Sequence, residues 1–519
     1  MEGLLDGYRS AAYDEMVDTH GEPHPHTRSL YEALQLLSGA DLVERCDARD
    51  RVFRNQGITF SHSGKEWVFP LDLIPRLMPE QEWQLVEAGV IQRVRALEAF
   101  LADVYGERAA LADGVVPHSL VATSTNFARA AAGIRPANGV RVHLAGIDLV
   151  RDVHGVMRVL EDNVRVPSGI SYVIENRETL ARVFPGLFLE EQVRPVAGYV
   201  ARLLESLRAA APGGAAADPT VVLLTPGVHN SAYFEHTFLS RNMGIDMVEG
   251  RDLFCRDNVL YMRTTSGERR VDVVYRRLDD DFLDPVHFRP DSVIGCPGLL
   301  NAARAGNVTI ANAVGNGVAD DKLTCTYVPA MIDYYLGERP LLPNVTTYRL
   351  DEPEVLTECL GRMDQLVFKP VDGSGGHGLV VGPHATDGEL AALREKVLAG
   401  PRGWIAQEVV LLSTVPSQVG DRLVPRHVDL RPFATHDGER VHVLPGGLTR
   451  VALREGSLVV NSSQGGGSKD TWVLTSAPER VARADWPVAY SALAVPAGAP
   501  DPGPLTDQQG QQQQSRPRC

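Results

Sequence analysis

The sequence predicts a mixed fold of the α+β and α/β classes, with a mainly helical N-terminal region and a small parallel sheet inserted between strand-rich segments. Three observations support this prediction. Apolar residues recur at helical spacing through residues 82–106. Two strand-like segments flank a turn at 152–155. A strand, a helix and a second strand follow one another from 219 to 248, an alternation typical of a parallel sheet.

Five regions follow from these patterns and from composition. The chain has 519 residues, enough for two or three domains. The segment APGGAAADP is typical of a loop and would separate the second region from the third. The Pro- and Gln-rich end is typical of a disordered tail. We expect a mainly helical region over residues 1–115 and a strand pair with following helices over 116–210. A β-α-β domain should span 219–315, and a region with a glycine-rich hairpin should span 316–474. The tail covers 475–519.

The overall charge excludes some classes of partner. Lys and Arg number 51 against 66 Asp and Glu, which gives a formal charge of −15. Nucleic acids and anionic membranes select for basic surfaces, so neither is expected as a partner. The six cysteines show no metal-ligand spacing, and neither a signal-like N-terminus nor a long apolar run is present. These features predict a cytoplasmic protein with reduced thiols.

Polar residues on the predicted strand pair form a candidate metal site. Asp148 lies before the turn at 152–155, and Glu161 and Asn163 lie after it. Residues two apart on a strand share a face, and a hairpin brings Asp148 opposite or diagonal to them. Two carboxylates and a carboxamide suit Mg²⁺, which prefers oxygen ligands together with phosphates. Spacing alone equally allows a solvent-facing polar strand.

A second candidate site is the glycine-rich stretch LVFKPVDGSGGHGLVVG, residues 366–382. Its glycines are followed by a strand rather than a helix, which argues against a dinucleotide fold. Leu379 after Gly378 excludes a Walker loop, which requires lysine there. A glycine-rich hairpin remains, with Lys369 on its incoming strand. Without such a loop, a strand lysine is more often a solvated side chain.

Taken together, the two sites resemble the ATP-grasp superfamily, in which an Asp and a Glu-x-Asn pair hold metal ions against ATP. Here the metal strands precede the lysine and the glycine loop, so the order is circularly permuted. Long segments resemble the circularly permuted type 2 ATP-grasp family, with glutathionylspermidine synthetase as a more distant relative. The resemblance covers about residues 14–474 and includes PLDLIPR, LEDNVRVPSGISYVIENR, NGVADDK, RHVDLRPF and GGLTRVALREGSLVVNSSQGGGSKDTWVL.

The resemblance implies roles for single residues. Asp148, Glu161 and Asn163 would hold Mg²⁺. ATP phosphates would meet two lysines and the glycine loop, which are Lys322, Lys369, Gly373, Ser374, Gly375, Gly376 and Gly378. The adenine would lie against Gln407, Glu408 and Val409, with Gln407 or Glu408 binding its amine. Charge on the transferring phosphate would be stabilised by Arg431 or Arg450, a choice that the sequence leaves open.

Candidate substrate residues follow from position in the predicted fold. Arg165 and Ser168 come directly after the metal strand. The loop after the strand at 220–224 lies at the carboxyl end of a strand of the parallel sheet, where ligands gather. Its candidates are His229, Asn230, Tyr233, Glu235 and His236. In YRRLDDDF, residues 275–282, a solvated charged turn is favoured over a ligand site. Three glycines before Lys469 suit either a mobile lid or a plain turn.

The function implied by the resemblance is an ATP- and Mg²⁺-dependent carboxylate–amine ligase that forms an acyl phosphate and releases ADP. Its partners would be small-molecule or peptide carboxylates and amines. The alternative is a non-catalytic ATP-binding module that acts with a partner protein. The intact metal site counts against the alternative. A Ser–His–Asp hydrolase has no GxSxG support. The oligomeric state and both substrates stay open.

Overall fold

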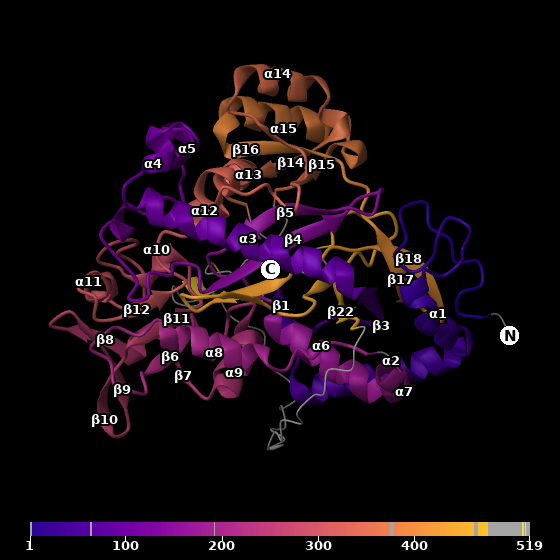
Figure 1. Cartoon of the computed structure of the whole chain (residues 1–519), viewed down its shortest axis with the longest axis horizontal. Coiled ribbons are helices and arrows are strands. Elements are labelled where there is room, and N and C mark those ends of the chain that lie inside the picture. Colours follow the sequence, from indigo (N-terminus) through magenta and orange to yellow (C-terminus); the bar gives the residue numbers. More distant parts are fainter. Residues whose placement is uncertain are drawn as a thin grey trace.

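A central antiparallel sheet lies below a separate lobe and beside a small parallel sheet (Figure 1). The computed structural model describes residues 3–62, 65–190, 192–373, 378–460, 466–475, 511, 512 and 514. In these ranges, no helix is both long enough and apolar enough to cross a membrane.

The central sheet has the strand order β20-β19-β4-β5, and its pairings are antiparallel. Its strands are β4 (Leu144–Arg151), β5 (Met157–Asn163), β19 (Phe433–His436) and β20 (Val441–Val443). The long helix α3 (Glu80–Val104) packs its apolar stripe into the same core as Ile147 and Leu149 of β4. This confirms the helix expected at 82–106, although Leu85 of its stripe is half exposed.

The upper lobe contains the sheet β13-β16-β14-β15, with two helices above it in Figure 1. Its elements are β13 (Thr347–Arg349), α14 (Pro353–Gly361), β14 (Leu366–Pro370), β15 (Val380–Val381), α15 (Asp387–Ala399) and β16 (Trp404–Glu408). Phe368 points into the core of the lobe, whereas its neighbours Val367 and Lys369 line a pocket on the other side. The antiparallel pairing of β14 with β15 confirms the glycine-rich hairpin.

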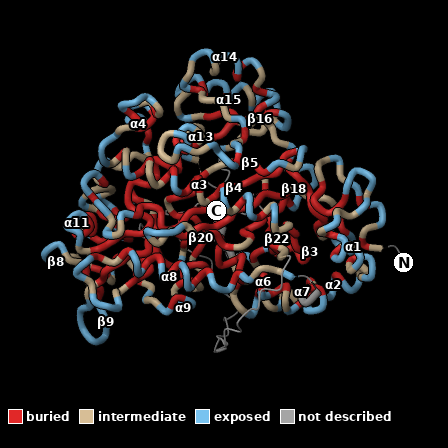
Figure 2. Tube along the Cα trace, in the orientation of Figure 1, coloured by how far each residue is buried: buried red, intermediate tan, exposed pale blue. Residues whose placement is uncertain are grey.

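The small sheet has the order β12-β11-β6-β7 and is parallel throughout. It comprises β6 (Val221–Leu224), α9 (Tyr233–Met243), β7 (Asp246–Val248), β11 (Val273–Arg276), α10 (Asp280–Leu283), α11 (Leu299–Arg304) and β12 (Thr309–Ala311). The expected β-α-β alternation is therefore confirmed. A ribbon of β8 (Leu253–Arg256), β9 (Val259–Thr264) and β10 (Gly267–Arg270) projects from it, and Figure 2 shows exposed chain at its end.

A further sheet joins distant parts of the sequence. Strand β22 (Gly467–Val473) lies parallel to β3 (Leu71–Met78) and antiparallel to β21 (Thr449–Val451). The N-terminal region, expected to be mainly helical, thus also supplies strands. Helix α6 (Ile170–Val183) and strand β17 (Thr414–Val419) contact this sheet. Further elements of the chain are α1 (Arg28–Gln35), α2 (Gly39–Gln56), β1 (Thr59–His62), β2 (Lys65–Val68), α7 (Pro185–Glu190), α8 (Tyr199–Ala209) and β18 (Arg422–His427).

Two arginines near the end of β11 are buried, so the solvated turn favoured for YRRLDDDF is wrong for them. Arg276 and Arg277 are each 1% exposed. Arg276 donates to three backbone carbonyls, those of Asn312, Leu278 and Ala313. Backbone carbonyls and a carboxylate accept hydrogen bonds from these guanidinium groups and so offset the cost of burying them. The local sequence, which is a run of charged residues, does not show these partners.

Candidate active site between the central sheet and the upper lobe

The β4–β5 hairpin places three predicted metal ligands on one face. Asp148 lies directly opposite Glu161, and Gly146 lies opposite Asn163. The turn is closed by the Asp152 carboxylate, which accepts hydrogen bonds from the backbone N–H groups of residues 154 and 156. Because partners in an antiparallel pair share a face, the three side chains converge as the spacing predicted.

Asp148 is held between two arginines. Arg431 forms a two-pronged ion pair with it, at 2.5 Å from Nε to Oδ1 and 2.7 Å from Nη2 to Oδ2. Arg450 Nη2 lies 2.7 Å from Oδ2 and also pairs with Asp429, a residue that sequence reasoning did not single out. All four side chains are nearly fully buried. Three of roughly four acceptor positions of the Asp148 carboxylate are thereby used, which leaves about one for another ligand.

Glu161 faces cations across the gap between sheet and lobe. Its Oε2 lies 3.4 Å from the Nζ of Lys322, the first residue of α13 (Lys322–Leu336). Burial acts to raise the pKa of Glu161, but the charges of Lys322 and Lys369 outweigh it and hold the pKa well below its usual range. Glu161 is therefore an anion at neutral pH and is available to a cation.

The two predicted phosphate lysines come from different elements, α13 and β14, and both line the pocket. Lys322 Nζ donates a hydrogen bond of 2.5 Å to the carbonyl of Gly373, at the start of the glycine loop. Lys369 lies on β14, where burial lowers its pKa to about 8 in spite of the nearby Glu161 carboxylate. An arriving anion would restore the charged form of Lys369, because it replaces the hydration that burial removes.

Asn163 provides the test of whether the site fits a metal ion. Its carboxamide is buried, and neither its oxygen nor its nitrogen has a hydrogen-bond partner among the described residues. Unpaired buried polar atoms are rare and point to a bound water or ion. No group of three or more His, Cys, Asp and Glu suited to a metal occurs in the described ranges. Asp148, Glu161 and Asn163 offer three oxygen-bearing side chains, fewer than a complete ligand set. Their chemistry fits Mg²⁺, which usually keeps several water and phosphate oxygens as ligands.

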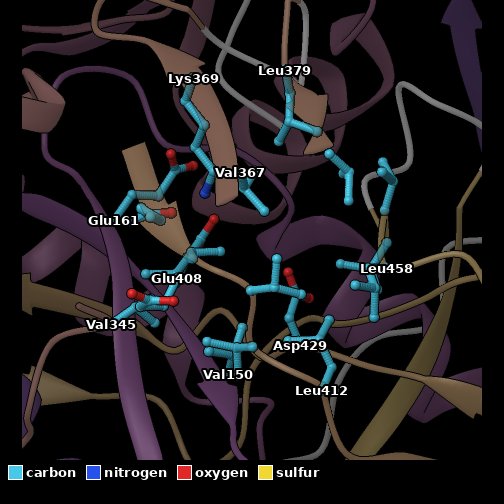
Figure 3. A pocket seen from close by; sticks show the side chains of 18 of the residues that line it. Val150, Glu161, Val345, Val367, Lys369, Leu379, Glu408, Leu412, Asp429 and Leu458 are labelled. Atoms are coloured by element: carbon cyan, nitrogen blue, oxygen red, sulfur yellow. The ribbon is translucent and has the colours of Figure 1, made fainter. Parts of the chain in front are cut away.

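A pocket connects this polar cluster to an apolar slot (Figure 3). It spans about 970 Å³, including open solvent at its mouth, which lies within the range of small-molecule sites. One end holds Glu161 and Lys369. The other is lined by apolar side chains, among them Val150, Val345, Val367, Leu379, Val381, Val410, Leu412 and Leu458. Such a pocket suits a ligand with a flat apolar part and an anionic part.

The segment at the end of β16 lines the apolar slot. Gln407, Glu408 and Val409 all contribute to the pocket. The Gln407 amide donates to Thr347 Oγ1 at 2.9 Å. The Glu408 carboxylate accepts from Tyr348 at 2.6 Å and Arg362 at 2.7 Å. Because the Gln407 and Glu408 side chains already have hydrogen-bond partners, the backbone groups of this segment are better suited than these side chains to contact a base.

The glycine loop is described only at its ends. Gly373 lines the pocket, and Gly378 has a φ of +76°, which favours glycine. Ser374, Gly375 and Gly376 lie outside the described residues. The lid considered for residues 461–470 also falls partly outside them. Its Lys469 belongs to strand β22, is 1% exposed and pairs with Asp72, so a mobile lid lysine is wrong.

The predicted substrate residues divide into two groups. Arg165 and Ser168 follow β5 directly. Arg165 Nε lies 3.4 Å from Asp279 and 3.7 Å from Asp320, and the Ser168 carbonyl lies 3.4 Å from Arg431 Nη1. Ser168 therefore lies beside the Asp148 cluster. Arg165 instead lies against the acidic residues Asp279 and Asp320.

The other four lie on the loop after β6 and the start of α9. Asn230 is 1% exposed and His229 and Tyr233 are partly buried. His236 is 0% exposed, its Nδ1 lies 2.9 Å from Thr225 Oγ1, and burial lowers its pKa well below the usual value. None of the four lines the pocket around Glu161.

Glu235, the remaining candidate of this loop, forms an ion pair that the sequence did not predict, and this pair links the loop to the strand pair. Glu235 pairs with Arg277 at 2.7 Å, and both side chains are 0% exposed. Glu235 also accepts hydrogen bonds from the backbone N–H groups of Gly169 and Ser171. Arg277 donates to the Pro167 carbonyl. The chain after β5 is therefore fixed to the carboxyl edge of the small sheet.

Comparison with known proteins agrees with this architecture. The family model of circularly permuted ATP-grasp type 2 proteins matches residues 75–452. An uncharacterised protein of Mycobacterium tuberculosis is 57% identical over 487 residues, covering 93% of this chain and 88% of that protein. An uncharacterised Synechocystis protein is 50% identical over 466 residues, covering 89% and 97%.

Two further matches carry descriptive names. A Frankia alni protein provisionally named a glutamate–cysteine ligase is 47% identical over 473 residues, which cover 91% of this chain but 54% of that protein. A solved structure of a glutathione synthetase-like effector from Globodera pallida, in its apo form, has a TM-score of 0.55 at 12% identity. It covers 84% of this chain and 98% of the effector, a likeness of fold alone.

Proposed function

Because the chain belongs to the circularly permuted ATP-grasp type 2 family, we propose that it is an ATP- and Mg²⁺-dependent carboxylate–amine ligase that releases ADP. The observation that supports this most is the single pocket in which an apolar slot meets Glu161, Lys322 and Lys369. The name of the Frankia relative also describes the joining of a carboxylate to an amine.

The proposed reaction has two steps. A carboxylate oxygen of the first substrate attacks the γ-phosphorus of ATP, which gives an acyl phosphate and ADP. The amine of the second substrate attacks the acyl carbon, loses a proton and expels inorganic phosphate, which leaves an amide. Phosphoryl transfer of this kind depends on positioning and charge neutralisation, so a site rich in fixed cations suits it.

Different residues of the pocket would contact different parts of ATP. The apolar side chains of Leu412 and Leu458 would contact the adenine, and the backbone at Val409 would bind its edge. Lys322 and Lys369 would contact the phosphates. Asp148, Glu161 and Asn163 would hold Mg²⁺, which when bound supplies positive charge to the phosphate oxygens.

The two arginines would take different roles. Arg450 lines the pocket and would face the transferring phosphate. Arg431 holds Asp148 in a two-pronged pair and lies against the Ser168 carbonyl, on the side where the chain turns toward the small sheet. We assign Arg431 to positioning Asp148 and to the carboxylate substrate, with Ser168 as its neighbour. Arg165 stays a candidate for the same carboxylate.

The test is ADP release with pooled carboxylates and pooled amines. Wild-type protein is compared with Glu161→Ala, with and without Mg²⁺. We expect ADP that requires ATP, Mg²⁺ and both pools, and that disappears in the variant. ATP that binds without release of ADP in any pool would contradict the ligase and support a non-catalytic module. Deconvolution of active pools would then identify the carboxylate and the amine.

A further inference from the structure

Three glutamines near the C-terminus, Gln511, Gln512 and Gln514, contact two loops at the edge of the small parallel sheet. One loop, residues 225–232, follows β6, and the other, residues 288–294, follows α10. Gln511 and Gln512 are only 6% and 5% exposed there. Two adjacent polar side chains that are this buried must be well satisfied by hydrogen bonds. We call the two loops together the tail site.

Gln511 makes a paired contact with the second loop. Its Nε2 donates to the Asp291 carbonyl at 2.6 Å, and its Oε1 accepts from the Val293 N–H at 2.8 Å. This pattern needs one donor and one acceptor on the same planar group. A carboxamide provides both, whereas a carboxylate provides acceptors alone. The second loop is thus selective for a carboxamide side chain.

Gln512 contacts the first loop. Asn230 Nδ2 donates to the main-chain carbonyl of Gln512 at 3.2 Å, and the His229 N–H lies 3.4 Å from its Oε1. Gly227 has a φ of +116°, and a Cβ built there would lie 2.6 Å from Gln512 Nε2. The absence of a side chain at Gly227 therefore leaves the space that the Gln512 amide fills.

Gln514 provides a weaker, exposed contact at the rim. Its Oε1 accepts from Arg289 Nη1 at 3.3 Å. Gln511, Gln512 and Gln514 have helical backbone, and residues three apart on a helix lie on the same side. Gln511 and Gln514 accordingly both face the second loop, and Gln512 faces the first.

We propose that the tail site is a peptide-binding site that recognises carboxamide side chains on a helical turn, and that the chain's own C-terminal segment occupies it in competition with a second peptide. The first loop leads to Glu235, which binds the backbone of Gly169 and Ser171 beyond the predicted metal strand. Use of this site for a peptide substrate rests on the proposed ligase function, but peptide binding itself does not.

The test is a titration without ATP. A fluorescent peptide with the sequence of residues 505–519, in which Ser replaces Cys519, is added to the full-length wild-type chain and to the full-length Gln511→Glu chain. The variant tail loses its donor to Asp291 and places a carboxylate against that carbonyl. We therefore expect the variant chain to bind the wild-type peptide at least about fivefold more tightly, because its site is vacated.

As a matched control, the binding of variant peptides to the Gln511→Glu chain is compared with that of the wild-type peptide. A peptide with Gln511→Glu should bind at least about tenfold more weakly than the wild-type peptide. It loses one buried hydrogen bond, and its carboxylate repels the Asp291 carbonyl. A peptide with Gln514→Glu keeps its acceptor opposite Arg289 and should bind at least as well as wild type.

Several results would overturn the proposal: equal binding of all three peptides, equal binding by both chains, or no binding to the variant chain. Such results would leave the ligase proposal unaffected, because ATP is absent from the titration. Conversely, a protein that binds these peptides as expected but never forms ADP would refute the ligase and leave the tail site in place.

Discussion

The two faces of strand β5 carry neighbouring acidic residues in very different surroundings. Asp162 points toward helix α3, where Arg93 forms a two-pronged ion pair with it at 2.5 and 2.8 Å, and both side chains are almost fully buried. Glu161 points into the pocket, where its nearest cation, Lys322, lies 3.4 Å away and its side chain is 25% exposed.

The two faces differ in how their charges are paired. Those on the helix face are fully paired within the protein, whereas those on the pocket face are incompletely paired. On the helix face, Arg93 and Asp162 balance each other. On the pocket face, four cations surround three carboxylates, and the buried Asn163 amide has no partner among the described residues. The residues concerned are Lys322, Lys369, Arg431, Arg450, Asp148, Glu161 and Asp429. A net positive, incompletely paired cluster favours a polyphosphate with a metal ion.

The largest effect is expected at Glu161. In Glu161→Gln, a predicted metal ligand loses its charge while the shape of the side chain is kept. We expect the rate of ADP formation to fall about a thousandfold or more, comparable with the loss of other transition-state stabilising groups. The melting temperature should change little. Steady-state ADP assays and thermal unfolding of the same preparations measure both quantities.

The matched substitution on the opposite face should reverse this pattern. Asp162→Asn leaves Arg93 buried without its anionic partner, which typically costs about 3–5 kcal/mol in the free energy of unfolding. Denaturant unfolding of Asp162→Asn and Glu161→Gln compares the two directly. If Glu161→Gln were the more destabilising, the assignment of the two faces would fail.

A smaller, pH-dependent effect is expected at Lys369. Its pKa is lowered to about 8, so its charged form is present below that pH and is lost as the pH rises through it. The affinity for ATP should therefore fall between about pH 7 and 9 in wild type. Lys369→Arg keeps the charge throughout and should remove most of this dependence. Titrations of ATP at several pH values, at constant salt, are the measurement.

The smallest effect is expected in the apolar slot. Leu458→Ala removes part of the surface predicted to contact the adenine, with a cost of about 1 kcal/mol, or roughly fivefold in affinity. The Mg²⁺ dependence of ATP binding should stay as in wild type, because the metal ligands are untouched. Isothermal titration with ATP and with inorganic triphosphate would show the loss for ATP alone.

One part of the arrangement was predictable because Asp148, Glu161 and Asn163 are close in sequence. The register that sets Asp148 opposite Glu161 follows from a short hairpin, and the glycine hairpin follows from its turn residues. Helix α3 followed from the period of its apolar residues. The assignment to the ATP-grasp fold depended on resemblance, since spacing alone allowed an ordinary polar strand.

What could not be predicted depends on contacts between distant segments. Arg450 contacts Asp148 from 302 positions away and is itself paired with Asp429. The Glu235–Arg277 pair likewise fixes the loop after β5. Lys469 looked like part of a glycine-rich lid, yet β22 buries it beside β3. In each case, burial of a charge is decided by a partner that the local sequence does not contain.

The most direct test measures ATP affinity with and without Mg²⁺ in wild type, Glu161→Gln and Asp162→Asn. If the cluster holds a metal against the phosphates, Mg²⁺ should strengthen ATP binding in wild type and in the folded Asp162→Asn protein. That gain should largely disappear in Glu161→Gln, although ATP still binds. An equal gain from Mg²⁺ in all three proteins would contradict the assignment of Glu161 to the metal site.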